Sequence, residues 1–171
     1  ERTGGAGMTG RLSGRFIAVT GAAQGIGRAI AGAFRSEGAD LFLIDRDGPL
    51  LAKTAADLQA DAGGALHHAQ ADVADAPGIT RVFAEAAQAA GRALDGLVNN
   101  AGVNVFHAPL ETSDAEWRRA FAINLDGAWA CARAVLPGMI AARHGVIVNI
   151  ASTHAFTIIP GTFPYPVVKH A

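Results

Sequence analysis

The sequence predicts an α/β fold, a doubly wound parallel sheet with helices on both faces. Five short segments are rich in Val, Ile, Leu and Phe with little alternation, at residues 16–20, 41–45, 65–71, 96–99 and 146–150. This pattern is typical of strands that are covered on both faces. Helical segments lie between them, and a glycine-rich turn follows the first strand. Such alternation of strands and helices favours a parallel sheet.

Four helical segments are expected, over residues 25–37, over 49–62, from residue 75 onward and over 114–143. Asp75 is a suitable N-cap for the third, because Pro77 can occupy its first turn. The fourth opens with a capping box, in which Ser113 and Glu116 satisfy each other's backbone N–H groups. Pro137 predicts a kink or a break inside this last helix.

Composition limits the class of protein. With 171 residues, 50% of them hydrophobic and 17% charged, the chain predicts one globular domain over residues 11–171 after a flexible tail at 1–10. A net charge of −1 argues against nucleic acid or an anionic membrane as partner. The tail lacks the apolar segment of a signal peptide. A single cysteine, Cys131, favours the reducing cytoplasm and a core position.

A glycine-rich turn, TGAAQGIG at residues 20–27, joins the first strand to the first helix. Gly21, Gly25 and Gly27 let the backbone turn tightly and approach a pyrophosphate closely. The free N–H groups at the start of the helix would then face its negative charge. An ordinary strand-to-helix turn is the alternative, but the placement between strand and helix favours a nucleotide site.

Asp45, at the end of the second strand, bears on which nucleotide binds. A carboxylate there can accept hydrogen bonds from the ribose hydroxyls of NAD, and it repels a 2′-phosphate. The alternative is a solvated turn aspartate. Arg46 could bind a 2′-phosphate, which keeps NADP open. Gln24 is not a basic residue, so NAD is the favoured cofactor and NADP the less favoured one.

Tyr165 is the single tyrosine of the chain, and Lys169 follows it by about one helical turn. A phenol is a poor base near neutral pH, with a pKa near ~10. An ammonium group close by favours the phenolate. Ser152 lies upstream, after the fifth predicted strand. A dinucleotide turn together with a Ser, a Tyr and a Lys indicates an enzyme that transfers hydride.

Five segments resemble the short-chain dehydrogenase/reductase family, and they occur in the order and at the spacing of that family. They are TGAAQGIG at 20–27, Asp72 with Val73, NNAG at 99–102, Asn124 within FAINL, and Ser152 with YPVVK at 165–169. The resemblance spans nearly the whole chain. It implies a Rossmann-like fold with a single-domain subunit.

The resemblance also implies roles for individual residues. Residues of the glycine turn would hold the pyrophosphate, and others would lie along the rest of the nucleotide. The cofactor-binding candidates are Gly21, Gln24, Gly25, Ile26, Gly27, Asp45, Arg46, Asp72, Val73, Asn99, Ala101, Gly102, Tyr165 and Lys169. Among the catalytic candidates, Ser152 would hold the substrate oxygen, Tyr165 would act as acid/base, and Lys169 would tune Tyr165. Asn124 would support a water that relays protons.

The function expected is NAD-dependent hydride transfer between a secondary alcohol or sugar hydroxyl and nicotinamide. Two alternatives stay open. One is an NADPH-dependent ketone or 3-oxoacyl-carrier reductase, and the other is a truncated chain that binds nucleotide without turnover. Relatives continue well beyond residue 171, so the C-terminal third of the fold is expected to be missing and one sheet edge open. A full-length chain of about 250 residues is expected to be a homotetramer or dimer.

Several other residues leave a choice. Val168 stands where the family usually has Ala or Ser, and it could crowd the cofactor or the helix contact. Polar residues after the fourth and fifth strands either face the substrate or are ordinary loop residues: Asn104, His107, Thr153 and His154. His67 and His68 would point to opposite faces of a strand, so no metal site is expected. Trp117 and Trp129 are expected to pack on helix faces.

Overall fold

A computed structural model describes residues 10–59 and 64–171 of the chain. Five parallel strands form the main sheet in the order β3-β2-β1-β4-β6. They are β1 (Phe16–Thr20), β2 (Asp40–Asp45), β3 (Leu66–Gln70), β4 (Gly96–Asn99) and β6 (Val146–Asn149). The predicted fold class is confirmed. The predicted tail, apart from Gly10, and the predicted end of the second helix at 60–62 lie outside the described residues.

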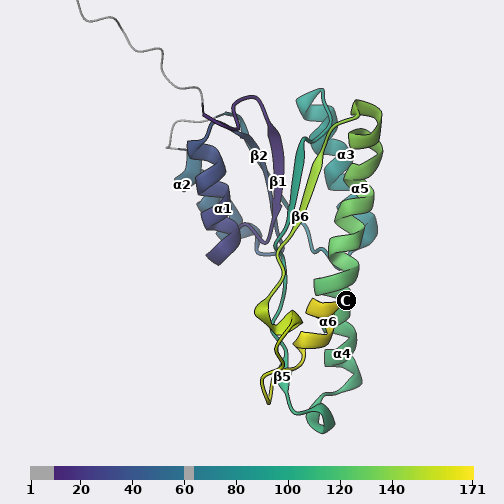
Figure 1. Ribbon diagram of the computed structural model, residues 1–171. Coiled ribbons are helices and arrows are strands. Elements are labelled where there is room, and N and C mark those ends of the chain that lie inside the picture. The colour runs from purple at the N-terminus through teal and green to yellow at the C-terminus, as the bar shows by residue number, and fades with distance from the viewer. Residues whose placement is uncertain (1–9, 60–63) are drawn as a thin grey trace, which may run out of the picture.

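Helices cover both faces of this sheet (Figure 1). On one face lie α1 (Gly25–Ser36) and α2 (Gly48–Gln59), and on the other lie α3 (Ala76–Ala90) and α5 (Gly127–Ala142). Each face has its own apolar core. Val19 and Leu43 belong to the core under α1, whereas Ala18 and Phe42 belong to the core under α3. Because side chains alternate along a strand, the central strands are buried on both faces.

Two of the predicted helix starts are confirmed. Asp75 caps α3, since its Oδ1 accepts from the N–H of Gly78 at 3.2 Å. Ser113 precedes α4 (Asp114–Phe121), and its Oγ accepts from the N–H of Glu116 at 3.2 Å. Glu116 Oε2 accepts in return from the N–H of Ser113 at 2.9 Å. These local hydrogen bonds replace partners that a helix cannot supply in its first turn.

The predicted helical segment over 114–143 is confirmed in extent, since residues 114–142 are helical, but it is not one α-helix and it does not break at Pro137. After α4 comes a π-helical turn, η2 (Ala122–Asp126), and then α5. Within the turn, Nδ2 of Asn124 donates to the carbonyl of Ala120 at 3.0 Å, four residues back. Pro137 lies inside α5, where Val135 and Met139 on either side of it are buried. Tertiary packing therefore carries the helix through the proline.

The two edge strands are less covered than predicted. In β3 no residue is fully buried, and in β6 Val146 and Val148 are 58% and 45% exposed. Val148 pairs with Val98, whose side chain packs in the core under α1. Val148 therefore faces the α1 side of the sheet, yet α1 and α2 lie over β1, β2 and β3 (Figure 1). The described residues leave an open apolar sheet edge, as expected from the sequence.

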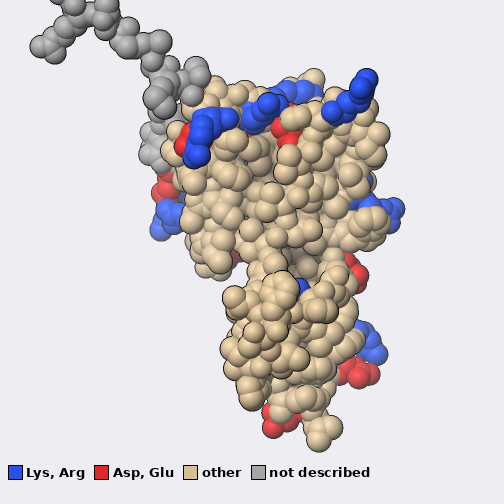
Figure 2. All heavy atoms as spheres, in the orientation of Figure 1, with Lys and Arg blue, Asp and Glu red and all other residues tan. Residues whose placement is uncertain are grey.

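A smaller group of elements, the lower lobe, projects beyond the carboxyl ends of the sheet strands (Figures 1 and 2). It contains α4, β5 (Phe106–His107), η1 (Pro109–Glu111), η3 (Thr153–Ala155), β7 (Phe163–Pro164) and α6 (Tyr165–His170). Strands β5 and β7 pair antiparallel. Trp117 packs here against Phe121, with ring centroids 4.6 Å apart. Trp129, on α5, is 59% exposed, so the prediction that it packs on a helix face is wrong.

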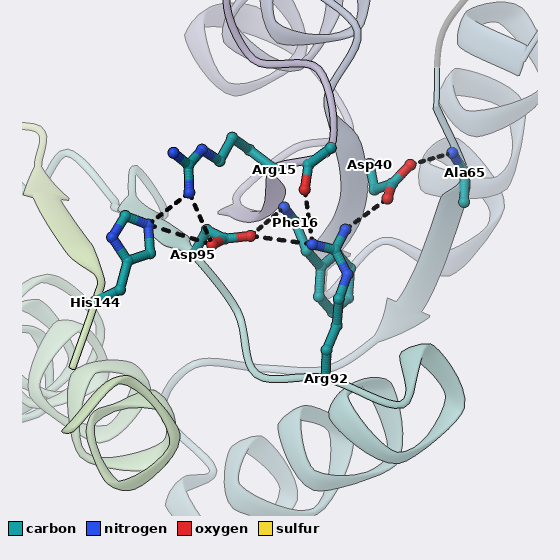
Figure 3. A network of polar contacts seen from close by, with 8 residues as sticks. Arg15, Phe16, Asp40, Ala65, Arg92, Asp95 and His144 are labelled. Carbon is teal, nitrogen blue, oxygen red and sulfur yellow. Dashed lines mark hydrogen bonds and ion pairs between the residues drawn. The ribbon is translucent and has the colours of Figure 1, made fainter. Parts of the chain in front are cut away.

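At the opposite end of the sheet a polar network ties strand starts together (Figure 3). Asp95 lies at its centre, accepting from the N–H of Phe16 at 2.8 Å and from Arg92 at 3.2 Å. Arg92 also pairs with Asp40. Arg15 and His144 complete the network around Asp95. Lys and Arg side chains gather at this end on the face shown in Figure 2. Along the described parts of the chain, every helix is too short or too polar to cross a membrane.

Candidate active site

A cavity of about 500 Å³ lies at the carboxyl ends of the strands, where open α/β sheets bind their ligands. Ten of the predicted cofactor-binding residues line it: Gly21, Gln24, Gly25, Ile26, Asp45, Arg46, Asp72, Val73, Ala101 and Gly102. Ile44, Ala71, Asn100, Val103, Asn104 and Ile123 complete the wall. Its volume is in the range of small-molecule and cofactor sites. Motifs far apart in the sequence thus form one site.

The glycine turn is shaped by its lack of side chains. Gly21 has φ +64°, and a Cβ there would lie 2.9 Å from the Cα of Ala101. A Cβ on Gly27 would overlap the carbonyl of Gly21, which places Gly27 beneath the turn rather than on the cavity wall. Gly25 has φ +56° and faces open space. The turn therefore leaves an open cradle at the start of α1, as a pyrophosphate requires.

Thr20 and Asn100 hold the turn in place, although neither was among the predicted site residues. Oγ1 of Thr20 accepts from the N–H groups of Asn100 and Ala101, both at 3.1 Å. Nδ2 of Asn100 donates to the carbonyls of Thr20 and Gly21 at 3.0 and 3.1 Å. These bonds connect the glycine turn to the end of β4. The signal was available, because Thr20 opens the glycine turn and Asn100 lies within the NNAG segment.

Asp45 is fixed against the glycine turn. Its Oδ2 accepts from the N–H of Ala23 at 3.0 Å, and its Oδ1 accepts from the N–H of Asp47 at 3.0 Å. Thr54 steadies the same loop by donating to the carbonyl of Ala23 at 2.7 Å. Each carboxylate oxygen has further lone pairs, so both can still accept from a ligand hydroxyl. Arg46 is exposed beside Asp45 on the same wall.

Asn99 lies behind the cavity, not on its wall. Its Nδ2 donates to Oδ1 of Asn149 at 2.9 Å and to the carbonyl of Ala128 at 3.2 Å. The side chain thereby links β4 to β6 and to α5. Asp72, by contrast, lies on the cavity wall. It accepts from the N–H of Ala74 at 2.9 Å, which fixes the turn after β3.

Asn124 is buried, and its side chain holds three backbone groups. Oδ1 accepts from the N–H of Val103 at 3.2 Å, while Nδ2 donates to the carbonyls of Val103 and Ala120 at 3.1 and 3.0 Å. Both amide protons are used in these bonds. The side chain therefore fixes the segment after β4, and its amide has no proton left to donate to a water.

Ser152 follows β6, and α6 brings Tyr165 and Lys169 to the carboxyl end of the same strand. Nζ of Lys169 donates to the carbonyl of Ile150 at 3.0 Å and lies 5.8 Å from the centre of the Tyr165 ring. Burial lowers the pKa of Lys169 below its ordinary value. Oγ of Ser152 accepts from the N–H of His154 at 3.2 Å. Because that bond uses only a lone pair of Ser152, its hydroxyl proton stays available for a ligand.

Val168 does not crowd this site. It is buried in a small cluster with Val105 and Ala120, beside the ring of Tyr165. The β-branched side chain therefore fills a contact between α6 and the lower lobe. It helps to fix the short helix that carries Tyr165 and Lys169.

Comparison with known proteins agrees with this site. The family profile described as short chain dehydrogenase matches residues 15–171. The chain belongs to the short-chain dehydrogenase/reductase family. It is 43% identical over 142 residues to galactitol 2-dehydrogenase (L-tagatose-forming) from Cereibacter sphaeroides, covering 83% of this chain and 54% of that protein.

Solved structures in the same family include complexes with either nucleotide. A 3-oxoacyl-[acyl-carrier protein] reductase from Brucella melitensis with bound NAD superimposes with a TM-score of 0.84 at 35% identity, covering 92% of this chain and 61% of that one. A structure from Beutenbergia cavernae holds NADP at low occupancy, with a TM-score of 0.84, 38% identity and coverage of 93% and 62%. The chain spans 54–64% of the length of the first curated relatives that it matches.

Proposed function

We propose that this chain belongs to an NAD-dependent oxidoreductase that transfers hydride between nicotinamide and a secondary alcohol or sugar hydroxyl. The observation that carries the proposal is the position of Tyr165 and Lys169. They lie together at the end of β6, next to β4, and the residues that follow β4 wall the glycine-lined cavity. An acid/base group beside a dinucleotide cradle is the arrangement that hydride transfer needs.

The residues of the cavity fit a dinucleotide. Gly25 leaves open space at the start of α1 for the pyrophosphate, and Asp45 can accept from ribose hydroxyls. Gly102 lies on the cavity wall and packs closely on Asn124, because a Cβ there would lie 2.7 Å from Oδ1 of Asn124. Bound NAD would supply the acceptor for the hydrogen that leaves the alcohol carbon with its electron pair.

The protein residues handle the proton and the oxygen. Tyr165, as phenolate, accepts the hydroxyl proton of the alcohol, and the charge of Lys169 favours that phenolate. Ser152 donates its free hydroxyl proton to the substrate oxygen, which fixes the alcohol against Tyr165. Asn124 holds the backbone around Val103 and supports a water that relays the proton to solvent.

A second candidate function is favoured by Arg46, which lies on the cavity wall beside Asp45. A guanidinium there could bind a 2′-phosphate and support NADPH-dependent reduction of a ketone or 3-oxoacyl group. Asp45 opposes this reading, because a carboxylate fixed by two backbone N–H groups would face that phosphate.

We further propose a homo-oligomer, dimer or tetramer, in the cytoplasm. The support for assembly is apolar surface on α5, where Trp129 is 59% and Ile140 is 70% exposed. Exposed apolar side chains of this size are typical of surfaces that another subunit covers. The single cysteine, buried Cys131, is compatible with a reducing compartment.

A direct assay tests the proposed function. The complete protein is titrated with NAD and with NADP, and reduction of each nucleotide is followed with a panel of secondary alcohols and sugars. We expect tighter binding and faster reduction of NAD. Faster ketone reduction with NADPH would support the second candidate. Binding of neither nucleotide would contradict both.

A further inference from the structure

His154 lies next to the two residues that would hold the reacting oxygen. It is the middle residue of the short helix η3, directly after β6. Its backbone N–H donates to Oγ of Ser152 at 3.2 Å. Its ring lies edge-on to that of Tyr165, with centroids 5.6 Å apart. His154 therefore lies beside both Ser152 and Tyr165.

The ring of Phe106 completes this aromatic cluster. It lies 5.5 Å from the ring of Tyr165 and 6.1 Å from that of His154, centroid to centroid. Phe106 is 45% exposed, so the cluster is open to solvent on one side. A ligand group that reaches His154 would thus meet one hydrogen-bonding ring between two aromatic ones.

Nδ1 of His154 is buried and has no hydrogen-bond partner among the described residues. The other histidines of this lobe and of the polar network are partnered. His107 pairs with Glu116 at 2.9 Å, and Nδ1 of His170 lies 2.7 Å from the carbonyl of Ala155. His144 contacts Asp95 at 3.2 Å. A buried polar atom without a partner is costly and calls for an explanation such as a ligand.

We infer that His154 is a specificity-determining residue that hydrogen-bonds a second oxygen of the substrate, on the carbon next to the one that is oxidised. The inference rests on the proposed function. With the reacting oxygen held by Ser152 and Tyr165, a group that meets His154 belongs to a neighbouring atom of the substrate. A neutral imidazole offers one donor and one acceptor, and a half-turn of the ring exchanges Nδ1 with Cδ2 and Nε2 with Cε1. A hydroxyl matches both, so the substrate is a vicinal diol or polyol.

Two small alcohols test this inference in the complete protein with NAD. 2,3-Butanediol carries the second oxygen, and 2-butanol lacks it. We expect kcat/KM for the diol to exceed that for 2-butanol by about tenfold, the effect of one hydrogen bond. His154→Phe keeps a ring between Tyr165 and Phe106 and removes both hydrogen-bonding nitrogens. In this variant the ratio of kcat/KM for the diol to kcat/KM for 2-butanol should fall close to one, because only the activity on the diol is lost.

His107→Gln is the matched control, because this neighbouring histidine already has a partner and should leave the ratio unchanged. Equal kcat/KM for the two alcohols in the unmodified protein would overturn the role of His154, whether or not the variant folds. An unchanged ratio of kcat/KM for the diol to kcat/KM for 2-butanol in folded His154→Phe would also overturn the role of His154. Either result would leave the dehydrogenase function standing. Absence of turnover with every alcohol tested would overturn the proposed function, and this inference with it.

Discussion

The side-chain amide of Asn124 hydrogen-bonds both backbone groups of Val103, its N–H at 3.2 Å and its carbonyl at 3.1 Å. One residue of a π-helical turn thereby holds the segment that leaves β4 along the cavity. The same amide donates to Ala120. The interruption between α4 and α5 is therefore tied to the shape of the candidate site, and Asn124 has a structural task besides any part in proton transfer.

Asn124→Ala is expected to lower the free energy of unfolding by about 1–3 kcal/mol, because it leaves buried backbone groups of Val103 and Ala120 without partners. Urea denaturation of the complete protein measures this loss. Asn104→Ala is the matched control, since Asn104 is exposed and should change stability by less than about 0.5 kcal/mol. Equal effects of the two substitutions would contradict the structural task of Asn124.

Asp95→Asn is expected to cost about 1–3 kcal/mol of stability. The amide can still accept from the N–H of Phe16, but it loses the charge that faces Arg92, Arg15 and His144. Asp114→Asn removes an exposed carboxylate paired with Arg118 and should cost no more than about 0.5 kcal/mol. Thermal denaturation of both variants compares them. A larger loss for Asp114→Asn would show that the network of Figure 3 does not stabilise the sheet.

Cys131 is expected to react slowly with alkylating reagents while the protein is folded, since burial raises the pKa of its thiol to about 12 from an ordinary 9.0. A raised pKa means that the fold favours the neutral thiol. Its contribution to stability is therefore complete below pH 9 and is lost as the pH rises toward 12. Mass spectrometry of iodoacetamide-treated protein, native and in urea, follows the reaction. Equal rates in both would show an accessible thiol.

The sheet and most of the nucleotide cavity could be predicted from the sequence because they depend on local signals. Apolar runs predict strands, and glycines between a strand and a helix predict the turn. The π turn at Asn124 could not be predicted, because its hydrogen bonds to Val103 join segments far apart in the sequence. Pro137 predicted a kink or a break, because proline cannot donate a helical hydrogen bond. The helix α5 nevertheless continues through Pro137, where Val135 and Met139 are buried. Strands β5 and β7, of two residues each, are too short to show a period.

The candidate catalytic residues could be predicted from motifs, whereas their surroundings depend on the three-dimensional structure. The sequence placed Tyr165 and Lys169 one helical turn apart, but the bond from Lys169 to the carbonyl of Ile150 depends on how α6 packs. From the sequence, His154 could be either an ordinary loop residue or a residue that faces the substrate. Only the three-dimensional arrangement shows its ring against Tyr165.

Asp45→Ala is expected to weaken NAD binding by about 1–3 kcal/mol and to narrow the preference for NAD over NADP, because it removes the acceptor for the ribose hydroxyls and the charge that repels a 2′-phosphate. Fluorescence titration of both nucleotides measures the change. Asp47→Asn, two residues along, keeps an acceptor for the N–H of Leu50 and should leave both affinities unchanged. Tighter binding of NADP than of NAD by the unmodified protein would contradict the assignment of Asp45.

Tyr165→Phe tests most directly whether this chain belongs to a dehydrogenase that uses Tyr165 as its acid/base. The substitution keeps the ring that packs against Phe106 and His154, and it removes only the hydroxyl. The measurement is the rate of NAD reduction by an alcohol that the unmodified complete protein oxidises, together with the Kd for NAD. We predict that turnover falls by about 10²–10⁴-fold while the Kd for NAD stays nearly the same. A variant that retains most of the unmodified rate would contradict the assignment.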